Sequence, residues 1–152
     1  MVVKDIFVIV NESLLSVRYE ESDLDEFTRL FEQWQDIEYL EIFFENNKGD
    51  LQSGFFGEIS VEDAVFETVD EAVAFESFVR EVAEDGKNNP ENTLSNQVFT
   101  PLHNNDYSKK HLQSKAYGLH GSSWLRIYAI RIATNLYVVT GGAIKLTKAM
   151  QD

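Results

Sequence analysis

The chain has 152 residues, of which 43% are hydrophobic, with no cysteine and a formal net charge of −13. This length and apolar content are typical of one packed globule, so we expect a single domain over residues 1–152. The lack of cysteine excludes disulfides, thiolate zinc sites and cysteine nucleophiles. The longest early apolar run, residues 6–10, is too short to cross a bilayer, and it is not preceded by a basic leader. We therefore expect a cytoplasmic protein with no membrane partner.

Charge is distributed unevenly along the chain. Residues 1–101 contain six Lys or Arg and 24 Asp or Glu, a net charge of −18, whereas residues 102–152 contain seven Lys or Arg and two Asp, a net charge of +5. The overall charge disfavours a nucleic-acid partner, because phosphate is also negative. The segment charges instead indicate an interaction face, and we expect any chemistry in the basic segment. The alternative is that acidic helices are simply soluble and the strands happen to be basic.

The first segment of the chain predicts a hairpin followed by two helices. Residues 4–10 and 14–20 are β-rich runs around a turn at residues 11–13. Ser22 and Asp25 then resemble a capping box. The apolar residues that follow at helical spacing are Leu24, Phe27, Leu30, Phe31 and Trp34. A second helix is expected over residues 36–47, and a polar loop over residues 46–57.

A long amphipathic helix is expected over residues 61–84, capped by Ser60 with Asp63 three residues later. Its apolar residues recur at steps of three and four, and Asp and Glu fill most of the other positions. The acidic face is typical of a solvated helix surface; the alternative is an acidic docking surface or a nucleic-acid mimic. Residues 85–97 are rich in Asn and predict a loop whose core residue is Leu94.

The basic segment predicts two strands, residues 124–132 and 136–146, joined by a turn. On the first strand Arg126 and Tyr128 share one face, opposite Leu125, Ile127 and Ala129. On the second, simple alternation buries Leu136, Val138, Ile144 and Leu146, and exposes Ala143, Lys145 and Thr147. Gly141-Gly142 predicts a bulge within this strand. Together the elements predict an α+β fold, an antiparallel sheet with helices packed on one face and a polar open face.

Familiar catalytic motifs are missing from the sequence. It has no phosphate-binding glycine loop, no Gly-x-Ser-x-Gly and no Cys/His metal spacing, and His103, His111 and His120 are too dispersed to predict a metal site. We therefore expect no metal and no cofactor. What remains is a basic and aromatic set in the second segment: Lys115, Tyr117, His120, Arg126, Tyr128, Arg131, Lys145 and Lys148. Arginine and lysine bind phosphate, and tyrosine or histidine can stack on a base or transfer a proton.

Four short segments, residues 99–102, 115–119, 124–128 and 142–148, resemble the C-terminal half of the RelE/HigB-like toxins. The resemblance covers about residues 99–151. It implies a RelE-like fold of helices on an antiparallel sheet. It also implies a toxin of a toxin–antitoxin system that cleaves mRNA on the ribosome without a metal, and a cognate antitoxin, such as a small helix-turn-helix protein, as partner.

The resemblance also implies roles for individual residues. Arg126 matches the strand arginine that contacts the scissile phosphate, Lys145 matches the basic residue at the end of the following strand, and Lys148 the one after it. Tyr128 and His120 match no position of the family pattern, and they complete the predicted catalytic set as residues that can transfer a proton. The predicted substrate-binding residues are Lys115, Tyr117 and Arg131. The alternative is a non-catalytic interaction module of the same fold, whose acidic helices bind a basic partner.

Overall fold

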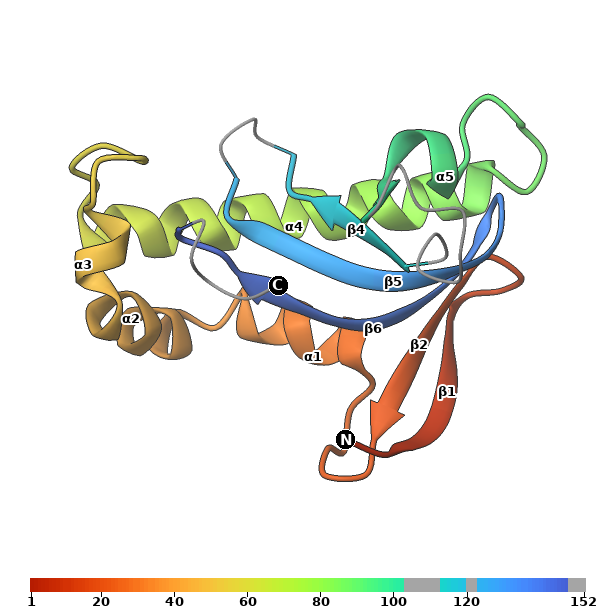
Figure 1. Ribbon diagram of the computed structural model, residues 1–152, viewed down its shortest axis with the longest axis horizontal. Coiled ribbons are helices and arrows are strands. Elements are labelled where there is room, and N and C mark those ends of the chain that lie inside the picture. The colour runs from red at the N-terminus through yellow and green to blue at the C-terminus, as the bar shows by residue number, and fades with distance from the viewer. Residues whose placement is uncertain (103–112, 120–122, 148–152) are drawn as a thin grey trace.

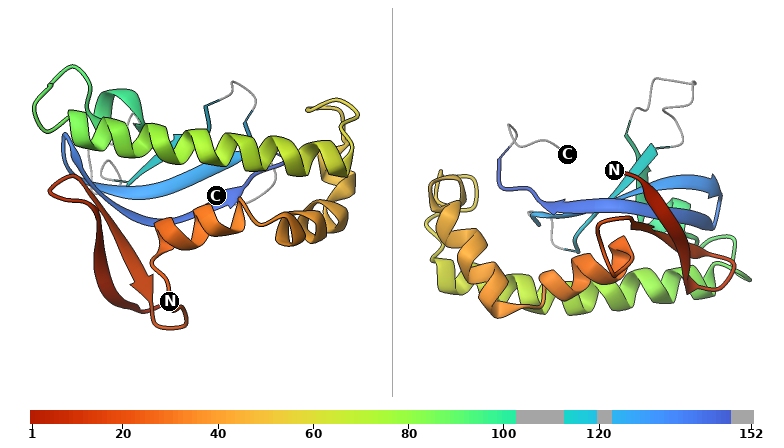
Figure 2. Two further views of the ribbon diagram at one scale, coloured as in Figure 1. Left: turned by 180° about the vertical axis from the view of Figure 1, so that it is seen from behind. Right: turned by 90° about the horizontal axis from the view of Figure 1, so that it is seen from below.

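The protein has an α+β fold, and its computed structural model describes residues 1–102, 113–119 and 123–147 (Figure 1). Six strands form one sheet in the order β1-β2-β6-β5-β4-β3. The strands are β1 (Val3–Val10), β2 (Leu14–Tyr19), β3 (Phe99–Pro101), β4 (Gln113–Tyr117), β5 (Leu125–Ala133) and β6 (Leu136–Ile144). The helices are α1 (Glu26–Gln33), α2 (Ile37–Asn46), α3 (Lys48–Leu51), α4 (Val61–Asp85) and α5 (Leu94–Gln97). Figure 2 shows α1 and α4 on one face of the sheet, and no described helix covers the opposite, open face.

The predicted hairpin is confirmed as β1 and β2, but its attachment makes the sheet mixed. β2 pairs in parallel with β6, from Leu14 opposite Tyr137 to Ser16 opposite Val139. All other neighbouring strands are antiparallel. The expectation of a purely antiparallel sheet was therefore wrong at this junction. The reason is topological, because the chain passes through the helices and β3–β5 before it returns beside β2.

The helices follow the predicted apolar spacing, with one corrected boundary. α1 begins after Asp25, whose carboxylate accepts a hydrogen bond from Thr28 N at 3.1 Å. Ser22 is not the cap, because its hydroxyl is hydrogen-bonded to the backbone of Leu24 in the preceding turn. The loop predicted after α2 contains the short helix α3, which forms where Leu51 is fully buried.

The long helix α4 matches its prediction closely. Ser60 caps its first turn by accepting a hydrogen bond from Asp63 N at 3.0 Å. Its apolar stripe packs into a core that includes the predicted residues Trp34, Phe75 and Ile127, all at most 1% exposed. The buried hydrophobic residues form one cluster that extends from Leu14 to Leu146, so the acidic and the basic segments share a core. Among the described helices, none is long and apolar enough to cross a membrane.

A bulge in β6 decides which side chains reach the open face. Tyr128 pairs with Gly141 but Ala129 pairs with Val139, so Thr140 is an extra residue, and the predicted bulge is confirmed. The extra residue shifts the alternation by one. Tyr137 and Val139 are buried before the bulge, and Ile144 and Leu146 after it. The expectation that Leu136 and Val138 share the buried face of Ile144 was therefore wrong, because that pattern was continued through the bulge.

The bulge is held by the hairpin. The Tyr19 hydroxyl donates a 2.6 Å hydrogen bond to the carbonyl of Thr140. Burial raises the pKa of Tyr19 above its ordinary value, and the negative charge of Glu26 adds to the shift. The partner of Glu26 is Arg29, whose pKa is raised chiefly by its hydrogen bonds to that carboxylate. The hydrogen bond of Tyr19, which is partly buried, thus joins β2 to β6, and the charges of α1 act on the same hydroxyl.

Candidate functional site

A cavity of about 400 Å³ opens on the uncovered face of the sheet, at the end where β4, β5 and β6 meet the loop after α3. Four predicted site residues line it: Lys115, Tyr117, Arg126 and Lys145. The remaining lining residues are Ser53, Phe55, Phe56, Ser123, Leu146 and Thr147. The structure therefore brings together two of the predicted catalytic residues and two of the predicted substrate-binding residues.

Strand register explains why these side chains meet. Tyr117 of β4 pairs with Arg126 of β5, and Arg126 pairs with Ala143 of β6. Lys145 follows two residues after Ala143, so it lies on the same face. Its backbone N–H donates a 2.7 Å hydrogen bond to Trp124 O, which keeps the chain beside β5 beyond the end of β6. The bulge in β6 thus sets the face on which Lys145 lies.

Arg126 is the best-defined cation of the cavity. Its Nη1 donates to the carbonyls of Ser123 and Leu125 at 2.8 and 2.9 Å, and its Cζ lies 4.3 Å from the centre of the Tyr117 ring. Its Nε is buried without a hydrogen-bond partner, and no carboxylate of the described residues pairs with it. A buried N–H without a partner is costly, so an acceptor from a bound anion would be favoured here.

Tyr117 joins the cations into one group. Besides Arg126, the Lys115 Nζ lies 5.3 Å from the centre of the same ring. Tyr117 is 46% exposed as a residue, so its contacts with the two cations leave it accessible at the cavity. Cations over an aromatic face are held by the quadrupole of the ring, which fixes their positions without neutralising their charge.

The loop after α3 adds aromatic residues that sequence reasoning missed. Phe56 packs edge-on against Trp124 with ring centres 5.0 Å apart, and Trp124 packs in turn against Phe44 of α2. Phe55 lies 4.7 Å from Phe56, yet it is 69% exposed at the cavity. The available signal was the pair of adjacent aromatic residues inside a polar loop between Gly54 and Gly57. An exposed ring of this kind is suited to stacking on a planar ligand.

Other predicted site residues lie elsewhere or outside the described chain. Tyr128 shares the open face and pairs with Lys115, but it does not line the cavity. Arg131 points to the other side, where its Nε donates to Ser95 Oγ of α5 at 3.2 Å. The structure thus does not bring Arg131 to the cavity. His120 and Lys148 lie outside the described residues, as do His103 and His111. Lys145, expected to be exposed, is only partly exposed because it lines the cavity wall.

The acidic side chains have a different distribution. The ion pairs among described residues join cations and carboxylates of the first segment: Arg18 with Asp5, Arg29 with Glu26, Arg80 with Glu76, and Lys87 with Glu84.

Within α4 the acidic residues are not equivalent. Glu67 and Asp70 are exposed, but Glu71 is 5% exposed and accepts a hydrogen bond from Ser123 Oγ at 2.8 Å. Glu71 therefore belongs to the interior. Among the described residues, no group of three or more His, Asp or Glu side chains is arranged to hold a metal ion.

Comparison with known proteins gives no further assignment. A scan against protein-family models finds no match to the chain, and searches of curated proteins and of solved structures find none either.

Proposed function

We propose that this protein is the toxin of a toxin–antitoxin system and acts as a metal-independent, ribosome-dependent mRNA endonuclease with a RelE-like fold. The observation that supports the proposal is the cavity on the open face of the sheet. It gathers Arg126, Lys115 and Lys145 around Tyr117, and Arg126 has a buried Nε–H with no partner. A phosphate of RNA would supply an acceptor oxygen for the Arg126 Nε–H.

The proposed reaction is attack of a ribose 2′-oxygen on the adjacent phosphorus. The new O–P bond forms as the bond to the 5′-oxygen breaks, which leaves a 2′,3′-cyclic phosphate and a 5′-hydroxyl. Negative charge develops on the phosphorane, and Arg126 and Lys145, which line the same cavity, would stabilise it. Lys115 would bind a neighbouring phosphate, and Tyr117 and Phe55 would stack on bases.

The proposal assigns proton transfer to two further residues. The 2′-hydroxyl must lose a proton and the leaving oxygen must gain one. Tyr128 lies on the same open face, two residues after Arg126 along β5. His120 follows β4 in the sequence. With these two groups, no metal-bound water is required for the cleavage.

The proposed partners are the translating ribosome with its mRNA and a cognate antitoxin that blocks the cavity. Such a function places the protein in the cytoplasm. A neighbouring gene for a small helix-turn-helix protein would support the assignment, since toxin and antitoxin of this kind are encoded together.

Expression in bacterial cells tests the proposal directly. Wild-type protein should arrest growth and cleave mRNA in the presence of translating ribosomes. Arg126→Ala should lose about 10²–10³ in cleavage rate, since one lost electrostatic stabiliser has this effect, and Lys145→Ala should behave similarly. The matched control is Arg131→Ala, on the same strand but directed to α5, which should keep full activity.

Thermal melts must show that all variants are folded. If the wild type is harmless and leaves mRNA intact with ribosomes present, the proposed catalysis is wrong. The alternative of an interaction module on the acidic helical face would then remain.

A further inference from the structure

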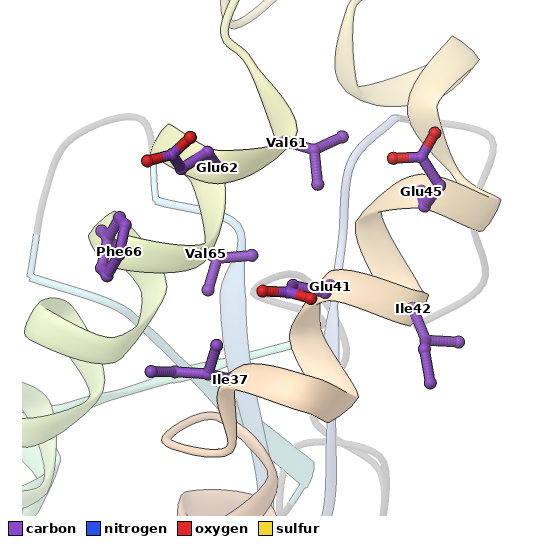
Figure 3. Close-up of a pocket in the computed structure, with 8 residues that line it drawn as sticks. All are labelled: Ile37, Glu41, Ile42, Glu45, Val61, Glu62, Val65 and Phe66. Atoms are coloured by element: carbon purple, nitrogen blue, oxygen red, sulfur yellow. The ribbon is translucent and has the colours of Figure 1, made fainter.

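A groove of about 540 Å³ lies between α2 and α4, in the helical part of the molecule and away from the cavity on the sheet. Its apolar lining consists of Ile37, Ile42, Val61, Val65 and Phe66. Figure 3 shows Val61 and Val65 of α4 directed toward α2, and Ile37 directed toward α4. Three of the five are large side chains with about half of their surface exposed: Ile37 at 46%, Ile42 at 58% and Phe66 at 52%.

This apolar surface is unexpected from the sequence pattern of α2. Leu40 and Phe44 of the same helix are fully buried and account for its packing on the core. Ile42 lies off that stripe, so the fold does not need it to be apolar. Ile37 begins the stripe, three residues before Leu40, yet it remains 46% exposed at the groove. A contiguous exposed apolar patch with a polar rim is typical of a binding surface.

The rim of the groove is acidic and unneutralised. Glu41 and Glu45 of α2 and Glu62 of α4 border it, and Figure 3 shows the Glu41 carboxylate directed toward α4. Each of the three residues is exposed, and none of their carboxylates has a hydrogen bond or an ion pair within the described part of the chain. Glu41 and Glu45 are four residues apart on one helix, a spacing at which like charges repel. A cationic partner would relieve this repulsion.

We infer that the α2–α4 groove binds an amphipathic helix of another protein, with apolar residues on one side and Lys or Arg beside them. A helix fits because the groove walls are two helices, whose backbone groups are already paired. A bound segment must therefore satisfy its own backbone hydrogen bonds. The charges of the rim require the partner to be basic.

A second copy of this chain fits the groove poorly. Its segment 1–101, which supplies α1 to α4, has 24 acidic and six basic residues. Docking one such helix into the groove of another copy would bring carboxylates against Glu41, Glu45 and Glu62. This inference stands independently of the proposed RNA cleavage, because the groove and the sheet cavity share no residue.

The test uses a synthetic helical peptide of about 18 residues, long enough to form a helix on binding, with Leu at positions i, i+3, i+4 and i+7 flanked by Lys. Two control peptides are a scrambled sequence of the same composition and a version with every Lys replaced by Glu. Titration into the full-length protein, followed by NMR of backbone amides, should shift residues 37–46 and 61–73. The scrambled and acidic peptides should bind at least about tenfold more weakly.

Variants separate the apolar and the charged contributions. Phe66→Ala and Ile42→Ala should each weaken peptide binding about tenfold or more, since each removes an apolar anchor. The triple change Glu41→Gln, Glu45→Gln, Glu62→Gln should weaken binding and remove most of its salt dependence. The control is Ile132→Ala, which truncates an equally exposed residue on β5 (59%) and should leave binding unchanged.

Three results would overturn the inference. The first is that the peptide does not bind at millimolar concentration. The second is that the scrambled peptide binds as tightly as the designed peptide, or that the Phe66→Ala variant binds the designed peptide as tightly as the wild type does. The third is a wild-type protein that dimerises in sedimentation equilibrium but becomes monomeric on Phe66→Ala, which would make a second copy the occupant.

Discussion

The sheet cavity and the α2–α4 groove are both lined by exposed apolar side chains, but the charged residues around them have opposite sign. The cavity surrounds Tyr117, Phe55 and Phe56 with lysine and arginine, whereas the groove surrounds Ile42 and Phe66 with glutamate. Both sites expose apolar side chains that the core does not use. The difference is one of charge, and it follows from the segment of chain that supplies each wall.

This contrast shows why the overall charge of −13 is a poor guide to partners. The ion pairs among the described residues join carboxylates and cations of the first segment, and no described carboxylate pairs with Arg126. The basic strands therefore keep their own potential although the whole molecule is acidic. Local fields of this kind, rather than net charge, decide which ligand approaches which face.

The largest expected effect comes from Trp124, which connects the two regions. Its ring contacts Phe44 of α2 and Phe56 of the cavity loop, and its Nε1 donates to Thr68 Oγ1 of α4 at 2.9 Å. Trp124→Ala should lower the free energy of unfolding by about 3–5 kcal/mol in urea denaturation. Trp124→Phe keeps the apolar contacts but loses the hydrogen bond, so it should cost less. An equal loss for both variants would contradict the packing explanation.

Two adjacent glycines give the next effect and a matched control. A Cβ at Gly142 would lie 2.5 Å from Arg126 O and 2.7 Å from Leu30 Cδ1, whereas at Gly141 the nearest atom would be 3.9 Å away. Gly142→Ala should lower the free energy of unfolding by about 1–3 kcal/mol in thermal or urea denaturation, because β5 and α1 must each move away from the new methyl group on β6. Gly141→Ala should cost much less. The same displacement should weaken ligand binding at Arg126, and equal behaviour of the two variants would refute this account of the close contact.

Binding of single-stranded RNA should distinguish the two arginines of β5. Each phosphate contact contributes about −0.7 to the slope of log affinity against log salt concentration. Arg126→Gln should make this slope less steep by about that amount in fluorescence anisotropy titrations, while Arg131→Gln should leave it unchanged. An unchanged slope in Arg126→Gln would show that the cavity does not hold phosphate.

The smallest effect concerns Tyr19, which holds the bulge that orients β6. Tyr19→Phe removes the hydrogen bond to Thr140 O and should lower the free energy of unfolding by about 0.5–1.5 kcal/mol near neutral pH. Because burial raises the pKa of Tyr19, the folded state favours the protonated phenol. This contribution is complete below the ordinary tyrosine pKa and is lost as pH rises through the higher folded value. The difference in the free energy of unfolding between wild type and variant should therefore shrink in urea titrations at strongly alkaline pH. A difference that stays constant with pH would contradict this role of the protonated phenol.

Elements defined by local patterns were the ones that could be predicted. α4 has a cap and a long apolar period, and the hairpin and β5 have dense β-forming runs, so each follows from its own residues. The four-residue helices α3 and α5 were missed because their length is too short to show a period. The parallel pairing of β2 with β6 has no local signal, since it joins distant segments.

The candidate site was predicted in part for the same reason. Strand alternation placed Arg126 and Tyr128 together on one face of β5, where the structure has them. It could not supply Phe55 and Phe56, which reach the cavity through a loop. Arg131 was assigned to the substrate because it belongs to the basic set of the second segment, although alternation along β5 places Arg131 and Arg126 on opposite faces.

The parallel junction of β2 and β6 has a consequence for the time course of folding. Tyr19 and Thr140, which meet at this junction, are 121 residues apart in the sequence. A ribosome must therefore synthesise nearly all of the described chain before the hairpin can find its neighbour, whereas α4 can form its own hydrogen bonds as it emerges. Closing so long a loop costs entropy before any contact compensates for it. We expect slow folding, limited by the closure of this junction, and an N-terminal hairpin that waits unpaired on the nascent chain.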